Sequence, residues 1–257
     1  MLQKRAIPCL LLKGSGFVKT VRFRNPVYLG DPINIVRLFN DKEADELIVL
    51  DITATIERRA PQYEAIATLT SECFMPLCYG GGVQTIEQMR KLFSLGIEKV
   101  SVNTAFVQNP ELITEAAELF GSQAVVGSID VKRDWLGRNR AFIASGRKNT
   151  GLDPTALARD FERRGAGEIL LNSVDRDGTM TGYDVDLIRD VATAVSVPVI
   201  ACGGAGSDKD LAVAIDAGAS AAAAGSLFVY QGPHRAVLIN YPSGQELRQL
   251  FADSDEP

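Results

Sequence analysis

The sequence predicts an α/β protein, a (β/α)8 TIM barrel built from two (β/α)4 half-barrel repeats. Short apolar runs typical of strands alternate with helical patterns eight times along the 257 residues. This matches the number of units and the length of such a barrel. Pairs of residues also recur at one constant spacing, which indicates an internal duplication. A doubly wound open sheet is the alternative, but no GxGxxG follows the first predicted strand.

Each element is placed by its local pattern. Strands are predicted where short apolar runs precede glycine or polar residues. Helices are predicted where apolar residues recur on one face, as Ile35, Leu38 and Phe39 do. The predicted strands are residues 6–12, 46–52, 76–80, 99–103, 123–130, 168–174, 198–202 and 221–225, and the predicted helices are residues 32–43, 59–72, 84–95, 109–120, 154–164, 184–195, 207–217 and 243–252.

The internal repeat has a spacing of 122 residues. Asp31-Pro32 and Asp153-Pro154 each predict a helix start, with Asp as the N-cap and Pro in the first turn. We interpret the chain as one domain, residues 1–257, with half-barrels at roughly 1–121 and 122–251. The same spacing relates Glu46 to Glu168, Gly81 and Gly82 to Gly203 and Gly204, Gly96 to Gly218, and Thr104 to Ser226.

Composition argues against several classes of function. The chain is 46% hydrophobic with a formal net charge of −5, which does not favour nucleic-acid binding. No apolar run suits a signal peptide or a membrane span, so we expect a cytoplasmic protein without a membrane partner. The single histidine and the cysteine spacing predict no metal site, and we expect no cofactor. Cys9, Cys78 and Cys202 lie in apolar runs and Cys73 does not; all four are expected to be free thiols.

Glycines and hydroxyl residues follow four of the predicted strands. YGGGVQT (79–85) and CGGAGSD (202–208) follow the third and seventh, and VNTAF (102–106) and AGSLF (224–228) end the fourth and eighth. Glycine lets backbone amides approach a phosphate, and helix N-termini add positive potential. A single Gly-Gly could be only a tight turn, but the matched pairs predict two phosphate sites facing each other and a diphosphorylated small-molecule ligand. The predicted phosphate-binding residues are Gly81, Gly82, Asn103, Thr104, Gly178, Gly203, Gly204, Gly225 and Ser226.

Two long basic segments follow the first and fifth predicted strands. Residues 14–30 and 132–148 contain several lysines and arginines among glycines. Long loops at the catalytic face of a barrel are often lids, and the alternative is a solvated basic surface.

The first and fifth predicted strands differ at one position. Aligned on their lysines, AIPCLLLKG (6–14) and VVGSIDVKR (125–133) place Leu11 where the second run has Asp130. A carboxylate at the end of a barrel strand is suited to acid–base chemistry. Asp51, Asp175 and Asp177 are further candidates, although any of these acids could instead bond a loop amide.

Four charged residues lie at the opposite ends of the predicted strands. They are Arg5, Glu46, Lys99 and Glu168. If strand alternation turns them inward, two acids and two bases meet at the bottom of the barrel, where charges persist only when paired. If it turns them outward, they are solvated; the pattern alone leaves both open.

Over nearly its whole length the chain resembles the HisF family, the cyclase subunit of imidazole glycerol phosphate synthase. The resemblance implies a lyase-type (cyclase-lyase) subunit of a glutamine amidotransferase complex in histidine biosynthesis, with two phosphate sites. It also implies a HisH-type glutaminase subunit docked at the barrel bottom, and ammonia entering past a gate formed by Arg5, Glu46, Lys99 and Glu168. The segments that carry the resemblance include KRAIPCL, DELIVLDITA, VSVNTA, IDVKR, SGRKNTG, RRGAGEILLNSVDRDGT and ACGGAG.

The resemblance also implies a catalytic pair of aspartates. The second corresponds to Asp130, but the first corresponds to Leu11, where this chain departs from the family. Lys19 corresponds to a family lysine in a flexible loop, and we take Asp177 as a further catalytic candidate. Loss of one positioned acid or base commonly costs about 10²–10⁴-fold in rate, so we expect poor cyclase activity.

Three functions remain open from the sequence. IPCLLLKG is similar to a divergent HisF-like branch that supplies ammonia to a separate sugar amidotransferase in surface-polysaccharide synthesis. The alternative is an authentic cyclase subunit in histidine biosynthesis, with Asp51, Asp175 or Asp177 replacing the missing aspartate. A third hypothesis is a docking and conduit subunit that binds no substrate.

Overall fold

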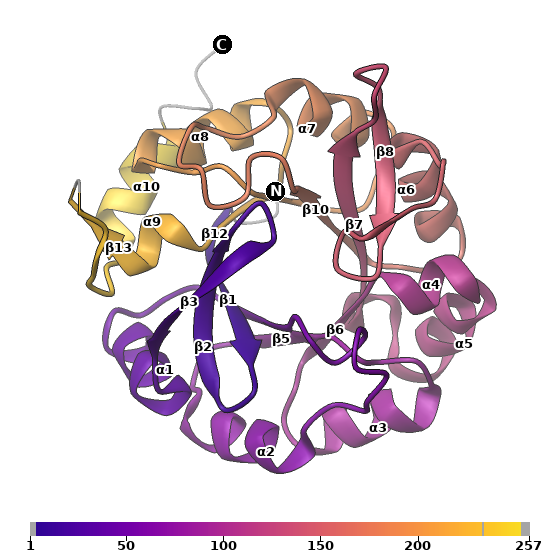
Figure 1. Ribbon diagram of the computed structural model, residues 1–257, viewed down its shortest axis with the longest axis horizontal. Helices are drawn as coiled ribbons and strands as arrows, with labels where there is room; N and C mark the ends of the chain where they lie inside the picture. The colour runs from indigo at the N-terminus through magenta and orange to yellow at the C-terminus, as the bar shows by residue number, and fades with distance from the viewer. Residues whose placement is uncertain (1–3, 233, 253–257) are drawn as a thin grey trace.

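The computed structural model describes residues 4–232 and 234–252, and its eight parallel strands close into a barrel surrounded by helices (Figure 1). The last barrel strand pairs in parallel with the first, with Ala6 opposite Ala222, and this pairing closes the sheet. In order around the barrel the strands are β1 (Arg5–Lys13), β4 (Leu47–Asp51), β5 (Leu77–Gly80), β6 (Lys99–Val102), β7 (Val125–Arg133), β10 (Glu168–Ser173), β11 (Val199–Cys202) and β12 (Ala221–Ala224).

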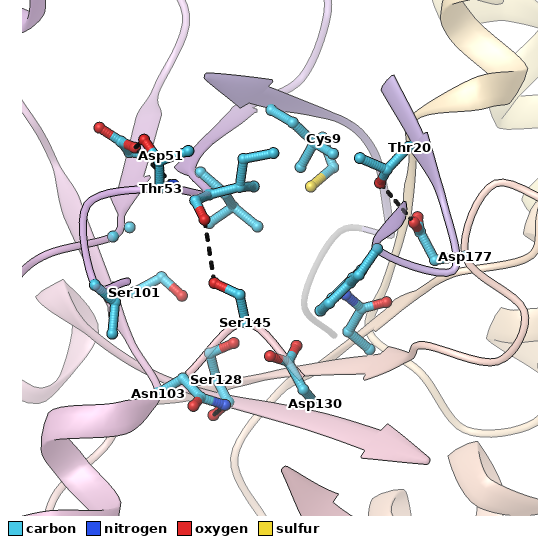
Figure 2. A pocket seen from close by; sticks show the side chains of 18 of the residues that line it. Cys9, Thr20, Asp51, Thr53, Ser101, Asn103, Ser128, Asp130, Ser145 and Asp177 are labelled. Carbon is cyan, nitrogen blue, oxygen red and sulfur yellow. Dashed lines mark hydrogen bonds between the residues drawn. The ribbon is translucent and has the colours of Figure 1, made fainter. Parts of the chain in front are cut away.

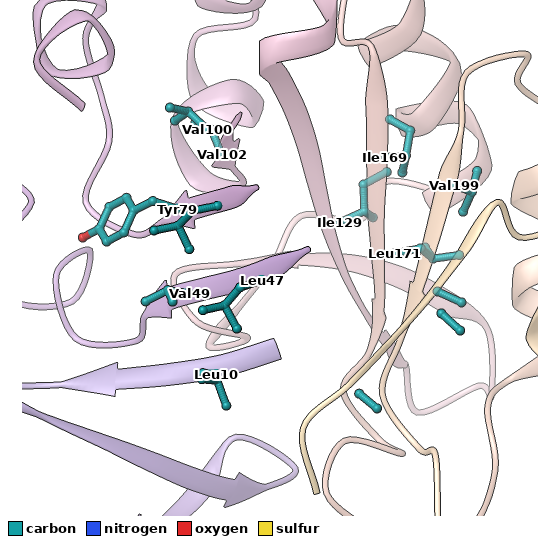
Figure 3. Packing of buried hydrophobic residues seen from close by; sticks show 14 of the residues in the cluster. Leu10, Leu47, Val49, Tyr79, Val100, Val102, Ile129, Ile169, Leu171 and Val199 are labelled. Atoms are coloured by element: carbon teal, nitrogen blue, oxygen red, sulfur yellow. The ribbon is translucent and has the colours of Figure 1, made fainter. Parts of the chain in front are cut away.

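Helices cover the outside of the barrel, and the predicted order of elements is confirmed within a few residues at each boundary. The carboxyl ends of the strands surround a cavity (Figure 2), and the main apolar core lies between the strands and the helices (Figure 3). The helices that cover the barrel are α1 (Pro32–Asp41), α2 (Tyr63–Glu72), α3 (Ile86–Ser94), α5 (Glu111–Phe120), α6 (Pro154–Arg163), α7 (Val185–Ala192), α8 (Asp208–Asp216) and α10 (Gly244–Ala252).

The two long basic segments are largely β-hairpins, so their prediction as loops was wrong. β2 (Gly16–Val21) folds back on β1 and pairs with β3 (Arg24–Gly30). β8 (Asn139–Ile143) folds back on β7 in the same way and pairs with β9 (Lys148–Asn149). β1 and β7 extend past the barrel, and their free backbone groups there pair with β2 and β8. This pairing forms strands although the local sequence has only a weak strand pattern.

Smaller elements complete the described chain. The short helices α4 (Thr104–Gln108) and α9 (Ser226–Val229) directly follow β6 and β12. A 3₁₀ turn, η1 (Ser122–Ala124), precedes β7, and β13 (Tyr230–Gln231) pairs with β14 (Ala236–Val237).

Residues related by the internal repeat adopt matching backbone conformations. Asp31 and Asp153 have φ/ψ of −69/132° and −73/132°, and each side chain accepts a hydrogen bond from the amide three residues later. Asn103 and Gly225, which precede α4 and α9, have φ/ψ of −107/−77° and −101/−71°. The duplication is therefore present in the backbone, while the boundary near residue 121 stays a prediction.

The two matched caps allow a stability test. We expect Asp31→Ala and Asp153→Ala each to lower the free energy of unfolding by about 1 kcal/mol, because each removes the acceptor for an N-terminal amide of its helix. Urea denaturation measures the loss. The conservative Asp→Asn changes should retain most of the stability, and an equal loss in the Asn variants would contradict a capping role.

Candidate functional site

A cavity of about 930 Å³ lies at the carboxyl ends of the barrel strands. All nine predicted phosphate-binding residues line it, together with Leu11, Lys19, Asp130 and Asp177. Figure 2 shows Asn103 and Asp177 on opposite sides of this cavity, one from each half of the repeat. Residues from the carboxyl end of every barrel strand therefore converge on one site.

The cavity has an apolar wall and a polar wall. Leu11 is 7% exposed and lies beside Leu50 in the parallel register of β1 and β4. Cys9 and Cys202 continue this apolar wall. Asp130 lies on the other side, beside Asn172 in the register of β7 and β10 (Figure 2). Leu11 thus lies across the cavity from Asp130, where it offers no group for proton transfer.

Asp130 has an unusual protonation equilibrium. Burial raises the pKa of its carboxyl group to about 7, with a further contribution from the negative charge of Asp177. Lys132 and a hydrogen bond from Asn172 act in the opposite direction but do not cancel the effect of burial. A carboxyl group with this pKa can exchange a proton near neutral pH, as general acid–base catalysis requires.

Lys19 and Asp177 form a buried ion pair. The Lys19 Nζ lies 2.9 Å from Asp177 Oδ1, and Thr20 Oγ1 lies 3.2 Å from Asp177 Oδ2. Lys19 is only 5% exposed and lies on β2, so its assignment to a loop was wrong. This contact joins the first hairpin to the loop after β10.

Asp51 and Asp175, the two other acids predicted as candidates for acid–base chemistry, are engaged in other contacts. Asp51 accepts hydrogen bonds from the amides of Thr53 and Ala54 and forms an ion pair with Arg59. Asp175 Oδ2 accepts a hydrogen bond from the Arg133 amide at 2.9 Å. With Asp177 paired to Lys19, each of these three carboxylates has a structural role.

The two predicted phosphate regions differ in their hydroxyl groups. Ser226 is 3% exposed and its Oγ has no hydrogen-bond partner among the described residues, whereas Thr104 Oγ1 accepts the Ala144 amide at 3.0 Å. The side chain of Lys19 lies over Gly225, where a Cβ atom would come within 2.9 Å of Lys19 Cε. The second region therefore combines a buried cation with an unpaired hydroxyl group.

The two hairpins meet above the cavity, which the sequence did not predict. A Cβ atom on Gly146 would lie 3.0 Å from the Phe23 ring, so these two turns are in contact. Ser145 Oγ donates a hydrogen bond to the Ile52 carbonyl at 3.2 Å, as Figure 2 shows. Phe23, Ala144 and Ser145 all have positive φ, a strained conformation for residues other than glycine.

The four predicted gate residues form a closed ring of ion pairs at the other end of the barrel. Arg5 bonds both Glu46 and Glu168, and Lys99 Nζ lies 3.0 Å from Glu46 and 2.8 Å from Glu168. The glutamates are 2% and 5% exposed. Burial alone would lower the pKa of Lys99, but the two carboxylates outweigh it and the pKa is raised. The side chains therefore point inward.

The space between the ring and the cavity has a polar edge. Lys99 and Ser101 share one face of β6, Asn103 follows the strand, and Ser101 and Asn103 line the cavity. The rest of this interior is mostly apolar. It contains Ile7, Cys9, Ile48, Cys78, Val126, Leu170, Ile200, Cys202, Ala221 and Ala223.

The fold and the site define a class: a (β/α)8 barrel with a ligand cavity at one end and a charged ring at the other. Residues 5–234 match the family model described as "Histidine biosynthesis protein". The chain is 53% identical over 248 residues to a Pseudomonas aeruginosa protein provisionally named imidazole glycerol phosphate synthase subunit hisF2, covering 96% of this chain and 99% of that protein.

Two further relatives also carry HisF names. A Leptospira interrogans protein provisionally named imidazole glycerol phosphate synthase subunit HisF is 48% identical, covering 98% of this chain and all of that protein. The Alkaliphilus metalliredigens protein named imidazole glycerol phosphate synthase subunit HisF is 47% identical, covering 90% of this chain and 92% of its own length. The chain belongs to the HisF family.

Residues 4–232 and 234–252 contain neither a membrane-spanning helix nor a metal-binding cluster. No helix there has the length and apolar character to cross a membrane. No cluster of three or more His, Cys, Asp or Glu residues there could hold a metal ion.

The raised pKa of Asp130 predicts that the stability of the native chain depends on pH in a way that a variant without this carboxyl group does not. The folded protein holds this proton up to about pH 7, whereas an unfolded Asp releases it near pH 4. The unfolded state thus binds fewer protons between these values, so this group lowers stability as the pH rises through that window.

We therefore expect the free energy of unfolding of Asp130→Asn, relative to that of the native chain, to increase by about 1–3 kcal/mol as the pH rises from 4.5 to 8. Urea denaturation at several pH values measures the difference. The control is Asp186→Asn, whose side chain is 88% exposed. A stability difference for Asp130→Asn that stays flat across this range would contradict the raised pKa.

Proposed function

We propose that this chain is a HisF-type subunit that receives ammonia through its barrel from a HisH-type glutaminase and passes it to an acceptor other than the usual cyclase substrate. The observation that carries the proposal is Leu11, which faces the cavity where the family has a catalytic aspartate. We place this function in the cytoplasm.

The charged ring supports ammonia entry at the barrel bottom. Its four side chains close the amino ends of the strands, and the interior above them leads to the ligand cavity. Breaking one ion pair would open the ring while the remaining pairs hold the other side chains. Neutral ammonia then meets a mostly apolar interior, whereas ions are excluded by the cost of desolvation.

The residues that line the cavity are suited to binding an anionic ligand, but they are poorly suited to the cyclase reaction. Glycines of both halves, the Ser226 hydroxyl and Lys19 suit phosphate groups. Closing the imidazole ring of the product needs proton transfers on two sides of the substrate, and Asp130 serves only one side. Since Asp51, Asp175 and Asp177 hold structural contacts, none of them favours an authentic cyclase in histidine biosynthesis.

We take the acceptor to be a sugar bound by a separate amidotransferase in surface-polysaccharide synthesis. The relatives named hisF2 in Pseudomonas aeruginosa and hisF3 in Vibrio vulnificus, the latter 45% identical, support a paralogue of the histidine-pathway subunit. A paralogue is free to lose the cyclase aspartate while it keeps the ammonia route.

The cyclase reaction tests the role of Leu11. With ammonium salt and the diphosphorylated ribulosyl substrate, we expect the native chain to turn over at least 100-fold more slowly than a HisF enzyme with both aspartates. We expect Leu11→Asp to raise turnover by 10-fold or more, because it restores a group for proton transfer. Leu11→Asn is the matched control and should stay slow. Native turnover near that of a two-aspartate enzyme would contradict the proposal.

The charged ring is tested in the assembled complex with the glutaminase. We expect Lys99→Ala to uncouple glutamine hydrolysis from ammonia use, because two buried carboxylates then share Arg5 alone and the ring no longer closes. The measurement is the ratio of glutamate formed to ammonia transferred, which should at least double. Lys91→Ala, an exposed lysine on α3, is the control. An unchanged ratio in Lys99→Ala, with the fold intact, would argue against a gate.

A further inference from the structure

The tip of the β7–β8 hairpin carries an exposed pair of large apolar side chains. Trp135 is 89% exposed and Leu136 is 52% exposed. Trp135 is the single tryptophan of the chain. Figure 1 shows this hairpin projecting beyond the ring of helices. Large apolar residues displayed together on a projecting turn are typical of interaction sites.

The turn that displays these side chains is held rigidly. Asp134 Oδ1 accepts the amides of Leu136 and Arg138 at 2.8 and 3.0 Å, and its Oδ2 lies 3.0 Å from Arg138 Nε. The Asp134 amide donates to the Arg138 carbonyl, and Gly137 supplies the positive φ of 76° that completes the turn. A preorganised turn loses little conformational freedom when it binds, which favours affinity.

The charge of this segment indicates the chemistry of the partner. Residues 132–149 contain six basic residues and one acidic residue, in a chain of net charge −5. Arg133 and Arg138 beside the tip are 59% and 55% exposed at their side chains. A second copy docked tip to tip would bring these cations together, which is unfavourable. The complementary surface is an apolar pocket with an acidic rim on another protein.

The position of the tip indicates what that protein does. The same strand, β7, carries Asp130 at the cavity and leads to Trp135 five residues later. The tip therefore extends from the cavity end of the barrel, and the charged ring lies at the opposite end, where a protein bound at the tip leaves it accessible to the glutaminase.

We infer that Trp135 and Leu136 bind the ammonia-consuming amidotransferase through an apolar pocket with an acidic rim. This inference rests on the proposed function. Docking at the tip holds the acceptor enzyme at the cavity end of the barrel, the end from which ammonia would leave.

The first experiment identifies the occupant in the cell. A photo-crosslinking amino acid replaces Trp135 in the full-length chain, and the cross-linked protein is identified by mass spectrometry. We expect an amidotransferase that acts on a sugar. Cross-links only to a second copy of this chain, to the glutaminase or to membrane lipid would overturn the inference.

The second experiment measures binding with purified amidotransferase. Incorporation of 5-fluorotryptophan gives the chain one ¹⁹F resonance, at the tip, and we expect it to shift or broaden on addition of the partner. We expect Trp135→Ala to weaken binding at least tenfold and Arg133→Glu to weaken it further at low salt. Leu119→Ala, which removes a 51% exposed leucine on α5, is the control and should bind normally.

Activity separates this inference from the proposed function. We expect Trp135→Ala to reduce glutamine-dependent amidation at least fivefold and to leave amidation with free ammonium unchanged. If Trp135→Ala transfers ammonia as well as the native chain does, the docking inference fails and the proposed function stands. If the native chain transfers no ammonia from glutamine, the proposed function itself fails.

Discussion

The buried ring of Arg5, Glu46, Lys99 and Glu168 is the constraint on which the barrel interior depends. Four charges can lie inside a barrel only when each is paired, and here every charge bonds two partners of opposite sign. Their positions fix the register of the strands from which they project, because a shift by one residue would turn them into the helix layer. The ring thus closes the barrel bottom and fixes which residues of these four strands point inward.

From the ring upward, strand alternation distributes the chemistry. On β1 the inward positions after Arg5 are Ile7, Cys9 and Leu11, so this strand is apolar up to the cavity. On β6 the inward positions after Lys99 are Ser101 and Asn103, which give a polar edge. Leu11 therefore extends an apolar wall that begins with Ile7 and Cys9. Asp130 on the facing side keeps its raised pKa because burial, not a partner at position 11, is its main cause.

The sequence predicted the elements that the duplication governs and missed those that depend on distant contacts. Asp31 and Asp153, or Gly81 and Gly203, must satisfy the same local backbone requirement, so their spacing revealed both halves. The hairpins were missed because their strands are held by the edges of β1 and β7. The partner of Lys19 is 158 residues away, and no local pattern could place it on β2 beside Asp177.

The two hairpins differ in their contacts. The first hairpin is fixed over the cavity by Lys19 and Asp177, and the second meets it through Gly146. The second hairpin also extends outward and displays Trp135 to solvent. The hairpin of β7 and β8 therefore both contacts the first hairpin over the cavity and carries the exposed tip. Asp130, paired with Phe142, stands at the base of this same hairpin, so the cavity acid and the exposed tip belong to one pair of strands.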